Sequence, residues 1–553
     1  MSGIVNKPFQ MHEQHAPASG RHAVTQGVPA CPVPLSAVAL LLNAQDDVAI
    51  ARRDLPADSV VSLDVIETPH LQIRLRQTIP AGHKLALRSL PAGAPVHRYG
   101  QVIGFASRAI AAGDHVHSHN LEVRPLVHKP GPEPLSTGVS QPIGWPAAPT
   151  FLGYRRPSGR VGTRNYVAVL ATVNCAAHTA QQIARHFSRK RLAAFANLDG
   201  VVAFTHPYGC TTAPDSPDHR LLQRTLAGII RHPNVGGALL VGLGCEANQI
   251  SDLIRAERLD LDSSAEGAPR LASLCIQHEG GIRKATRRGI ALVEELLAVA
   301  NTAQRTPQPV SELTLALQCG GSDSWSGVTA NPLIGLVSDA LVAQGGRVLL
   351  AETTELYGAE HLLAQRAASP EVAQRLLERI RWWEDRARQL GLTIDNNPSP
   401  GNKAGGLTTI YDKSLGAMAK GGSTPLVAVY DYAESVVARG LSLMDTPGND
   451  PVSVTGQVAG GCNLVLFSTG RGSVFGGKPA PVIKICSNSA TYAHMRQDMD
   501  FNAGIVLEGT SLPQAAVQLI ELVVAVASGQ PTRSEAQGVG EAEFVPWHLG
   551  STL

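Results

Sequence analysis

Hydrophobic and polar positions follow one pattern over residues 36–125, where short strand-like runs are separated by a recurring turn. The turn reads DLPADS at 54, TIPAGH at 78, SLPAGA at 89 and AIAAGD at 109, which share the form apolar-Pro/Ala-Ala-Gly/Asp. Proline presets φ and a glycine two residues later accepts positive φ, so this spacing favours tight reversals. The pattern predicts a small all-β module over residues 36–125.

From residue 151 the pattern changes to continuous apolar runs that alternate with amphipathic helical segments. Examples are NYVAVLATVNC, GVVAFTHPYGC and GGALLVGLGC, each followed by a helical segment. The alternation restarts after residue 311 with ELTLALQCGG and GRVLLAET, and NLVLFST and APVIKICS follow a glycine-rich stretch. Such runs are typical of parallel strands that helices cover on both faces. We therefore predict doubly wound, mainly parallel α/β domains, one over residues 151–395 and a C-terminal one over 396–553.

Two further segments are predicted to lie outside these domains. Residues 1–35 contain no apolar segment of the secretory type and have the composition of a disordered tail. Residues 126–150 are rich in proline, glycine and serine, which is typical of a linker. A length of 553 residues agrees with several domains rather than one core.

Composition and charge argue against several classes of function. The formal net charge is +2 without a long run of one sign, and aromatic residues make up 4% of the chain, so we expect no nucleic-acid partner. Apolar runs such as LIELVVAVA are much shorter than the roughly 20 residues of a membrane span. Eight cysteines in so long a chain do not predict a disulfide framework. We expect a soluble cytoplasmic protein without a membrane partner.

Four cysteines stand at equivalent places, each at or after the end of a predicted strand. They are Cys175, Cys210, Cys245 and Cys319. Because ligands of open α/β sheets bind outside the carboxyl ends of the strands, we expect these thiols along one edge of the sheet. Together they would form a soft-ligand site for iron or an iron–sulfur cluster, although no CxxC spacing supports it. The alternative is that each cysteine is a small buried apolar residue.

A second candidate metal site lies in the predicted β module, in HVHSHN at 115–120. On a strand His115, His117 and His119 point to one face, and three imidazoles suit a divalent metal. A solvated edge strand with polar residues is the alternative. GLGCEA at 242–247 fits a dinucleotide-binding pattern, but a cysteine and Glu246 crowd the turn where a pyrophosphate would lie. GSVFGGKP at 472–479 lacks the hydroxyl residue of a phosphate loop.

Cations on glycine-rich segments suggest an anionic substrate. TRN, NPSPGNKAGG, DKSLG and STGRGS contain the candidate substrate-binding residues Arg164, Asn165, Lys403, Lys413 and Arg471. Glycine lets backbone N–H groups approach an anion, and lysine or arginine neutralises it. Taken singly, each segment is also compatible with an ordinary loop.

Several long motifs resemble one known family. They are GYRRPSGRVGTRN, THPYGC, GLGCEANQ, QCGGSDSWSGVTANP, NPSPGNKAGGLTTIYDKSLG and STGRGSVFGG, together with GHKLAL, RYGQVIGFA and GDHVHSHN near the N-terminus. The chain resembles the altronate/galactarate dehydratase family from about residue 40 to its end, with an N-terminal SAF domain. The resemblance implies dehydration of aldonic or aldaric acids to 2-keto-3-deoxy acids and dependence on Fe²⁺, with Mn²⁺ as an alternative. A related member removes sulfite from sulfolactate.

One stretch departs from the family pattern. Where relatives have His-x-x-Asp-Asn-Val-Ala, this chain reads NAQDDVA, with Asn43 for the histidine and Asp47 for the asparagine. If that histidine serves the site, Asn43 cannot act as its acid or base. A C–S β-eliminating lyase on the same scaffold and a non-catalytic acid-binding protein therefore remain as alternatives to a hydro-lyase.

Dehydration of a 2,3-dihydroxy acid assigns roles to the candidate residues. A metal near the four cysteines would stabilise the enediolate, with His206 or a histidine of the β module near the leaving hydroxyl. Arg164, Lys403 and Arg471 would hold the carboxylate. Asp323 and Glu246 are alternative bases or metal ligands. We expect a small anionic sugar-acid substrate and a homo-oligomer.

Overall fold

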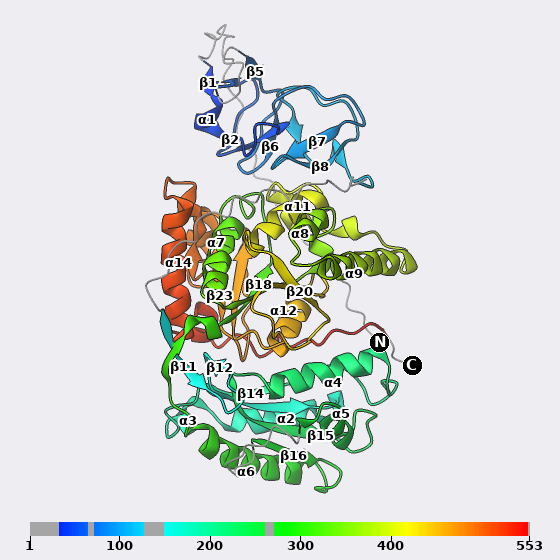
Figure 1. Ribbon diagram of the computed structural model, residues 1–553, viewed down its shortest axis with the longest axis vertical. Coiled ribbons are helices and arrows are strands. Elements are labelled where there is room, and N and C mark those ends of the chain that lie inside the picture. The colour runs from blue at the N-terminus through cyan, green and yellow to red at the C-terminus, as the bar shows by residue number, and fades with distance from the viewer. Residues whose placement is uncertain (1–31, 65–70, 127–148, 260–269, 551–553) are drawn as a thin grey trace, which may run out of the picture.

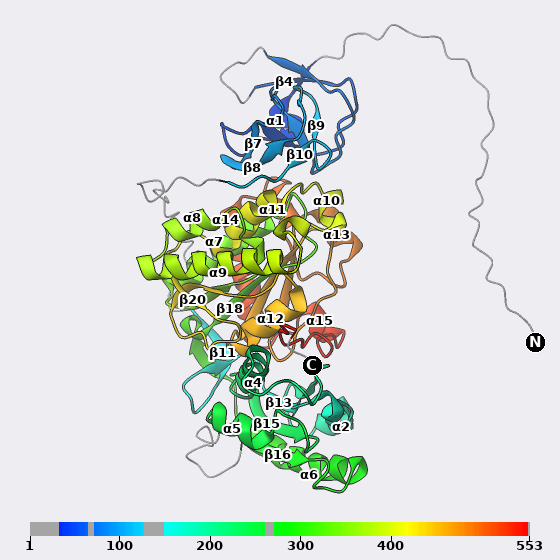
Figure 2. The same ribbon diagram turned by 90° about the vertical axis from the view of Figure 1, so that its right-hand side faces the viewer.

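Three regions follow one another along the long axis of the molecule (Figures 1 and 2). The computed structural model describes residues 32–64, 71–126, 149–259 and 270–550. A strand-rich N-terminal module lies at one end, a unit built on a seven-stranded sheet lies in the middle, and a unit built on a four-stranded sheet lies at the other end. Most of the expected tail and linker lies outside the described residues.

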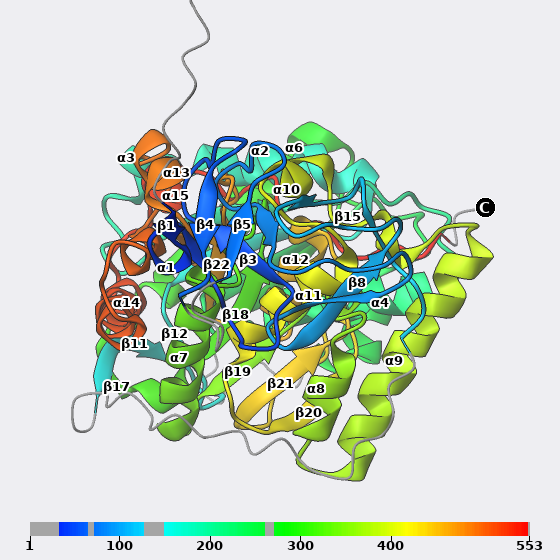
Figure 3. The same cartoon turned by 90° about the horizontal axis from the view of Figure 1, so that it is seen from above.

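The N-terminal module consists of short strands in three small sheets, ordered β1-β4-β5, β2-β3-β6-β9 and β10-β8-β7. The recurring turn of the sequence takes positive φ at its fifth residue each time, at Asp58 (64°), Gly82 (79°), Gly93 (83°) and Gly113 (89°). The prediction of a small all-β module is therefore confirmed, and Figure 3 looks down on it over the larger unit. Its elements are β1 (Val33–Pro34), α1 (Leu35–Val38), β2 (Ala39–Leu40), β3 (Val48–Ala51), β4 (Val60–Ser62), β5 (Gln72–Arg74), β6 (Lys84–Ala86), β7 (Pro95–Arg98), β8 (Gln101–Ala106), β9 (His115–Val116) and β10 (Leu121–Glu122).

The four-stranded unit has parallel strands in the order β14-β13-β15-β16. Helices α2 and α6 pack together against the sheet, and α4 contacts its strands as well as α12 of the neighbouring unit. Its elements are β13 (Tyr166–Ala171), α2 (Asn174–His186), α3 (Arg189–Leu192), β14 (Gly200–Phe204), α4 (Pro217–Ile230), β15 (Val235–Gly242), α5 (Ile250–Ala256), β16 (Leu271–Cys275) and α6 (Ile282–Ala300). A separate three-stranded sheet joins β12 (Val161–Gly162), β11 (Thr150–Arg155) and β17 (Thr306–Pro309).

The middle unit has a seven-stranded parallel sheet in the order β20-β21-β19-β18-β22-β23-β24. The expected domain boundary at 395/396 falls between β19 and β20 of this sheet. Helices α7 and α14 pack on each other, and α12 packs against β18. The elements are β18 (Thr314–Cys319), α7 (Ala330–Ala343), β19 (Arg347–Leu350), α8 (Glu360–Gln365), α9 (Pro370–Gln389), α10 (Pro400–Ala404), α11 (Ile410–Met418), β20 (Leu426–Tyr430), β21 (Gly440–Met444), α12 (Asp450–Ala459), β22 (Leu464–Thr469), β23 (Val482–Cys486), α13 (Ser489–His494), β24 (Phe501–Asn502), α14 (Leu512–Ala527) and α15 (Arg533–Ala536).

The fold class predicted from the apolar runs, a small β module followed by mainly parallel α/β units, is thus confirmed. Among the described residues, no helix has the length and apolar character that crossing a bilayer requires.

A buried ion cluster docks the N-terminal module on α11. Lys84 Nζ donates to Asp412 Oδ2 at 2.7 Å, and Arg98 Nη1 donates to Asp412 Oδ1 at 2.8 Å. All three side chains are 0% exposed. Arg98 Nη2 also donates to the carbonyl of Ser324, so the module contacts the loop that follows β18. Both segments held in this way, α11 and the loop after β18, carry candidate site residues.

Candidate active site

The loops that follow β18 and β22 meet at the point of the sheet where the strand order reverses, because successive strands lie on opposite sides of β18. From β18 the chain builds β19 on one side, and the later β22 lies on the other side. Gly320 N donates to Ser468 O at 3.1 Å, and Gly470 N and Arg471 N donate to Gly321 O at 3.0 and 2.8 Å. In open α/β sheets ligands bind at such a switch point, outside the carboxyl ends of the strands.

Two carboxylates from the end of the neighbouring strand β19 lie beside Cys319. The Cys319 thiol is 3.4 Å from Glu352 Oε2 and 3.5 Å from Glu355 Oε2, and the three residues are buried. One ligand atom from each lies within 4.8 Å of the others. Glu352 has φ of 63°, a conformation that costs a non-glycine residue free energy and that often marks a functional site.

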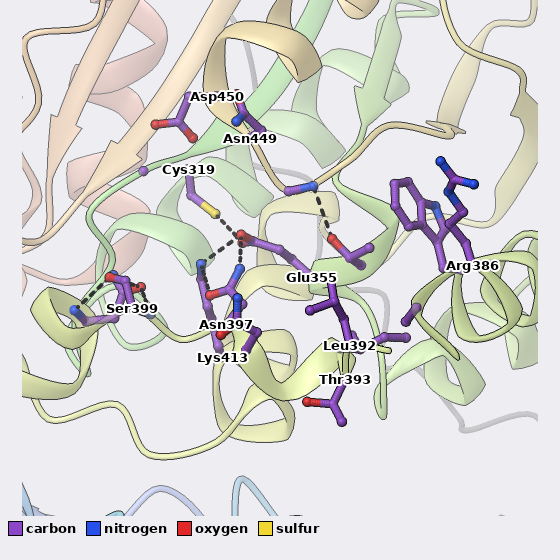
Figure 4. A pocket seen from close by; sticks show the side chains of 18 of the residues that line it. Cys319, Glu355, Arg386, Leu392, Thr393, Asn397, Ser399, Lys413, Asn449 and Asp450 are labelled. Atoms are coloured by element: carbon purple, nitrogen blue, oxygen red, sulfur yellow. Dashed lines mark hydrogen bonds and ion pairs between the residues drawn. The ribbon is translucent and has the colours of Figure 1, made fainter. Parts of the chain in front are cut away.

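Two lysines complete this buried cluster. Lys413 on α11 donates to Glu355 Oε1 at 2.8 Å and to Asn397 Oδ1 at 3.0 Å. Lys420, just after α11, donates to Cys319 Sγ at 2.8 Å and lies 3.8 Å from Glu352 Oε2. Figure 4 shows Cys319, Glu355 and Lys413 pointing toward one another. Because buried charges must be paired, each ammonium group compensates a neighbouring acidic group.

The carboxyl groups of the cluster differ in their proton affinity. Burial, and then the neighbouring charge of Glu355, raises the pKa of Glu352 to about 8. Burial opposes ionisation of Glu355 too, but Lys413 outweighs it and leaves the pKa of Glu355 lowered. Asp450, the first residue of α12, has its pKa raised to about 6 by burial and by Glu355. Carboxyl groups with separated pKa values are the usual basis for distinct acid and base roles.

A cavity of about 590 Å³ opens beside the cluster. Its size lies in the range of small-molecule sites. Polar side chains of the wall include Glu355, Asn397, Lys413, Asn449 and Asp450. In Figure 4 they surround the same space, to which α9 and the segment after it contribute Arg386, Leu392 and Thr393.

The donor set around Cys319 fits a divalent metal. Sulfur with carboxylate oxygen suits a transition metal better than a purely oxygen-binding ion such as Mg²⁺. Glu352 Oε1 is buried and has no hydrogen-bond partner among the described residues, so one ligand oxygen is available without breaking a bond. Burial raises the pKa of the Cys319 thiol, and both Lys420 and a metal would favour its thiolate.

The three expected histidines of the β module come together, and a fourth joins them. Ring centroids are 5.3 Å apart for His115 and His117 and 5.5 Å for His115 and His119. His83 Nδ1 lies 2.9 Å from His115 Nε2. Burial lowers the pKa of His83 to about 4 and that of His115 to about 3, so both rings are neutral near pH 7. His117 Nε2 lies 2.9 Å from the carbonyl of Lys403, which places the group at the junction with α10.

The four expected cysteines do not share one sheet edge. Cys175, Cys210 and Cys245 follow β13, β14 and β15 of the four-stranded sheet, whereas Cys319 ends β18 of the other sheet. Cys275, at the end of β16, is the fourth thiol of the smaller sheet. Within the described ranges, the set of Cys319, Glu352 and Glu355 is the one with metal-binding geometry.

Three further expected acid–base residues take part in internal hydrogen bonds. His206 lies after β14, where its Nε2 is 3.1 Å from Ala171 O, and burial lowers its pKa to about 4. Glu246 accepts from Leu243 N at 3.0 Å and Gly244 N at 2.6 Å, the amides that a pyrophosphate would need. Asp323 is buried and accepts from the side chains of Ser326, Ser487 and Asn488. None of these three lines the cavity beside Cys319.

The expected substrate-binding residues lie in three places. Arg164 and Asn165 are buried in the four-stranded unit, where Asn165 Nδ2 donates to Asn197 O and Ala300 O. Lys403 on α10 is half-buried, and Arg471 is exposed beside the loop after β18. Lys413 alone of the five lines the cavity beside Cys319.

Arg164 is bound to other parts of the protein, so its replacement should lower the stability of the fold. Its Nε and Nη2 donate to the two carboxylate oxygens of Glu535 at 2.7 and 2.8 Å, and its Nη1 donates to Val526 O at 2.8 Å. Arg164→Met would leave Glu535 and several carbonyls unpaired, so we expect a loss of about 3 kcal/mol in the free energy of unfolding. Urea titration measures it. The control is Arg533→Met, because Arg533 lies on α15 beside Glu535 but its side chain does not form these hydrogen bonds. An equal loss of stability in the control would contradict the role of the Arg164–Glu535 pair.

Several site residues were missed by the sequence reasoning, namely Glu352, Glu355, Lys420 and Asp450. A signal for two of them was present, because GRVLLAETTE places carboxylates directly after a predicted strand. Asn43, the departure from the family pattern, is exposed, and its Oδ1 accepts from Gln45 N at 2.9 Å. It lines a different cavity, which it shares with Tyr99 and Gly327.

Comparisons with known proteins agree with one another. Residues 37–124 match the altronate/galactarate dehydratase SAF domain, residues 153–301 the D-galactarate dehydratase/altronate hydrolase second domain, and residues 310–552 the D-galactarate/altronate dehydratase C-terminal domain. Altronate dehydratase of Escherichia coli K12 is 37% identical over 89% of this chain and 96% of its own length. The Bacillus subtilis 168 altronate dehydratase is 35% identical over the same shares. Galactarate dehydratase (L-threo-forming) of E. coli K12 is 37% identical over 83% of this chain and 88% of its own length.

Proposed function

The chain belongs to the D-galactarate/altronate dehydratase family of hydro-lyases, and we propose that it dehydrates an altronate-like aldonate or galactarate at the cavity beside Cys319. The product would be a 2-keto-3-deoxy acid. One observation carries the proposal: the cavity at the switch point is lined by two of the three metal donors, Cys319 and Glu355, by a carboxyl group with a pKa near 6 and by a protonated lysine.

The reaction moves a proton and a hydroxyl group. A base removes the proton from C2, the electrons of that bond form the C2–C3 double bond, and the 3-hydroxyl leaves as water after taking up a proton. The resulting enol then gains a proton at C3 and becomes the 2-keto acid. The C2 proton is weakly acidic because it lies beside a carboxylate, so the negative charge that develops must be stabilised.

Cys319, Glu352 and Glu355 would hold the metal, for which we propose Fe²⁺, with Mn²⁺ as the alternative. When bound, the metal supplies positive charge beside the substrate carboxylate and 2-hydroxyl. Lys413 adds a fixed positive charge to the same wall of the cavity. Burial would lower its pKa, but Glu355 outweighs that effect and raises it, so Lys413 remains protonated.

Asp450 is the residue that we assign to the C2 proton. It lines the cavity, and a pKa raised to about 6 leaves it mostly ionised near neutral pH yet more basic than an ordinary aspartate. A general base works best with a pKa near the working pH. The carboxyl group that has taken this proton can deliver it to the departing 3-hydroxyl. Asn449 offers its side-chain amide to the hydroxyls of the sugar acid.

The test of function uses protein purified without oxygen and reconstituted with Fe²⁺. Altronate, galactarate, related sugar acids and sulfolactate are offered separately, and 2-keto-3-deoxy acid and sulfite are assayed. We expect keto-deoxy acid from one sugar acid. Sulfite from sulfolactate without any keto-deoxy product would instead favour the C–S lyase, and tight binding of a sugar acid without product would favour a binding protein.

Removal of the metal gives a separate prediction. Chelation should lower turnover at least about 100-fold, and added Fe²⁺ should restore it, since the bound metal would supply positive charge where negative charge develops on the substrate. Cys319→Ala should lose most of the bound iron, measured by elemental analysis. Cys245→Ala removes an exposed thiol of the other sheet and is the matched control. Full iron in the Cys319 variant would exclude Cys319 as a ligand, and loss of iron in the Cys245 variant would place the metal at the smaller sheet.

A further inference from the structure

A second large cavity lies between the two α/β units. Its volume is about 710 Å³, and its walls come from the turn at 156–160, from α4 and the start of β16, and from residues 433–435 and the end of α12. Figures 1 and 2 show α4 and α12 facing each other at this boundary. None of the residues that line it belongs to the cavity beside Cys319. Junctions between domains are frequent places for small-molecule sites.

The lining of this cavity is strongly basic. Five arginines and two glutamates contribute to it, and the arginines are Arg156, Arg160, Arg224, Arg231 and Arg270. Both glutamates have basic partners, because Glu257 lies 3.7 Å from Arg231 and Glu434 lies 3.5 Å from Arg375, which is not part of the lining. Neither glutamate of the lining is paired with Arg156, Arg160 or Arg224.

Three of the arginines are held by neutral groups. Arg156 Nε donates to Pro233 O at 2.7 Å, Arg160 Nη2 to Ser435 Oγ at 2.8 Å, and Arg224 Nη1 to Tyr432 O at 3.2 Å. Across the described parts of the chain, no carboxylate lies within ion-pair distance of these three guanidinium groups. The neutral bonds fix each guanidinium group in place but leave its charge uncompensated.

The arginines also lie close enough to disfavour one another. Arg156 is buried, and burial followed by the positive charge of Arg270 lowers its pKa to about 9. His232 in the same wall is affected in the same way, since burial and then Arg160 and Arg156 lower its pKa to about 3. Hydrogen bonds to neutral groups account for the position of each arginine, but they do not account for the gathering of several cations around one cavity. An anion in that space would remove the repulsion.

We propose that this cavity is a binding site for a small multivalent anion that carries phosphoryl or several carboxylate groups, separate from the elimination site. Guanidinium groups bind both kinds of oxyanion through paired N–H donors. The volume suits a metabolite-sized anion rather than a single simple ion. Since Arg156 and Arg160 belong to one unit and Ser435 and Glu434 to the other, the bound anion would also strengthen the contact between the units.

The test is calorimetric titration of the full chain at constant ionic strength with inorganic phosphate, glucose 6-phosphate and citrate. Arg160→Gln combined with Arg224→Gln should raise the dissociation constant at least tenfold, because each residue contributes charge with few other bonds. Arg381→Gln, an exposed change on α9, should not affect it. Lys413→Met should bind the anion normally, which separates this site from the elimination site.

The three probes distinguish the sources of the anion. Tighter binding of glucose 6-phosphate than of the other two indicates a phosphorylated metabolite, whereas tighter binding of citrate indicates a polycarboxylate. Unchanged affinity in the double variant would overturn the proposal. Binding heat from sodium chloride equal to that from the three probes would also overturn it. If the double variant does not fold, Arg224→Lys replaces it, for which a severalfold weaker affinity is expected and an unchanged one again overturns the proposal. Turnover without anion should stay unchanged in either variant, whatever substrate the enzyme takes.

Discussion

Glu355→Gln is expected to lower kcat/KM by about 100- to 1000-fold, the order of loss that follows removal of a central charge-stabilising group. The Glu355 side chain is 3.5 Å from the Cys319 thiol and 2.8 Å from the Lys413 ammonium group. Glutamine keeps the shape but removes the charge, so a metal ligand is weakened and Lys413 loses its partner. Steady-state kinetics with elemental analysis measure turnover and bound metal in the same preparation.

Two matched variants decide whether this loss belongs to the site. Glu246→Gln and His206→Asn change the two other candidate acid–base residues that lie in the four-stranded unit. We expect turnover within about tenfold of the unmodified enzyme for both, because residues outside the site affect the chemistry through stability alone. If these variants lost activity while Glu355→Gln kept it, the reaction would belong to the edge of the smaller sheet.

The sequence predicts local features well. The recurring turn needs positive φ at one position, and Asp58, Gly82, Gly93 and Gly113 all take it. The strand runs are equally local, because a parallel strand buried on both faces is apolar throughout. For the same reason Cys319 was correctly placed at the end of a strand, now β18.

The assignment of strands to sheets is not a local property, and there the sequence reasoning failed. Cys175, Cys210, Cys245 and Cys319 stand at equivalent strand ends, and the restart of the alternation after residue 311 does not by itself show that β18 joins a second sheet. Once the sheet is known, the neighbour of Cys319 is the end of β19, and Glu352 and Glu355 follow. The pairing of strands, rather than the identity of the motifs, was the missing information.

Long-range ion pairs were equally invisible. Arg164 stands on a glycine-containing loop and has the features of an anion-binding residue, but its carboxylate partner is Glu535, 371 residues away. Lys413 stands on a similar segment and does line the cavity beside Cys319, because α11 passes the end of β18. A basic residue on a loop thus indicates that an anion is near, without distinguishing a substrate from a side chain of the same protein.

Docking of the N-terminal module should depend on Asp412. This carboxylate is the partner of Lys84 and Arg98, and all three side chains are 0% exposed. Asp412→Leu would leave two buried cations unpaired, and we expect a loss of about 5 kcal/mol in the free energy of unfolding, at the upper end for a broken buried ion pair. Urea titration of the full chain measures it, with the exposed change Glu294→Gln in the middle of α6 as a control that should not alter stability.

The pH dependence identifies the cause of this loss. Burial would raise the pKa of Asp412, but Lys84 and Arg98 outweigh it and hold the pKa well below its usual range. A carboxyl group with a lowered pKa stabilises the fold above its unfolded value of about 4, and this contribution is lost as the pH falls toward the folded value. The difference between the unmodified protein and Asp412→Leu should therefore be complete at pH 7 and shrink below about pH 4. A difference that stayed constant with pH would indicate a packing defect instead.

A combined variant separates loss of charge pairing from loss of the module. Replacing Lys84 and Arg98 by methionine together with Asp412→Leu removes all three charges, and apolar replacements of buried ion groups often restore stability. We expect the triple variant to regain most of the stability that Asp412→Leu loses. Because Asp412 is followed directly by Lys413, whose ammonium group contacts Glu355, turnover should stay reduced in the triple variant if the ion cluster also positions α11. Full recovery of both stability and turnover would show that the ion cluster docks the N-terminal module and does not position α11 for catalysis.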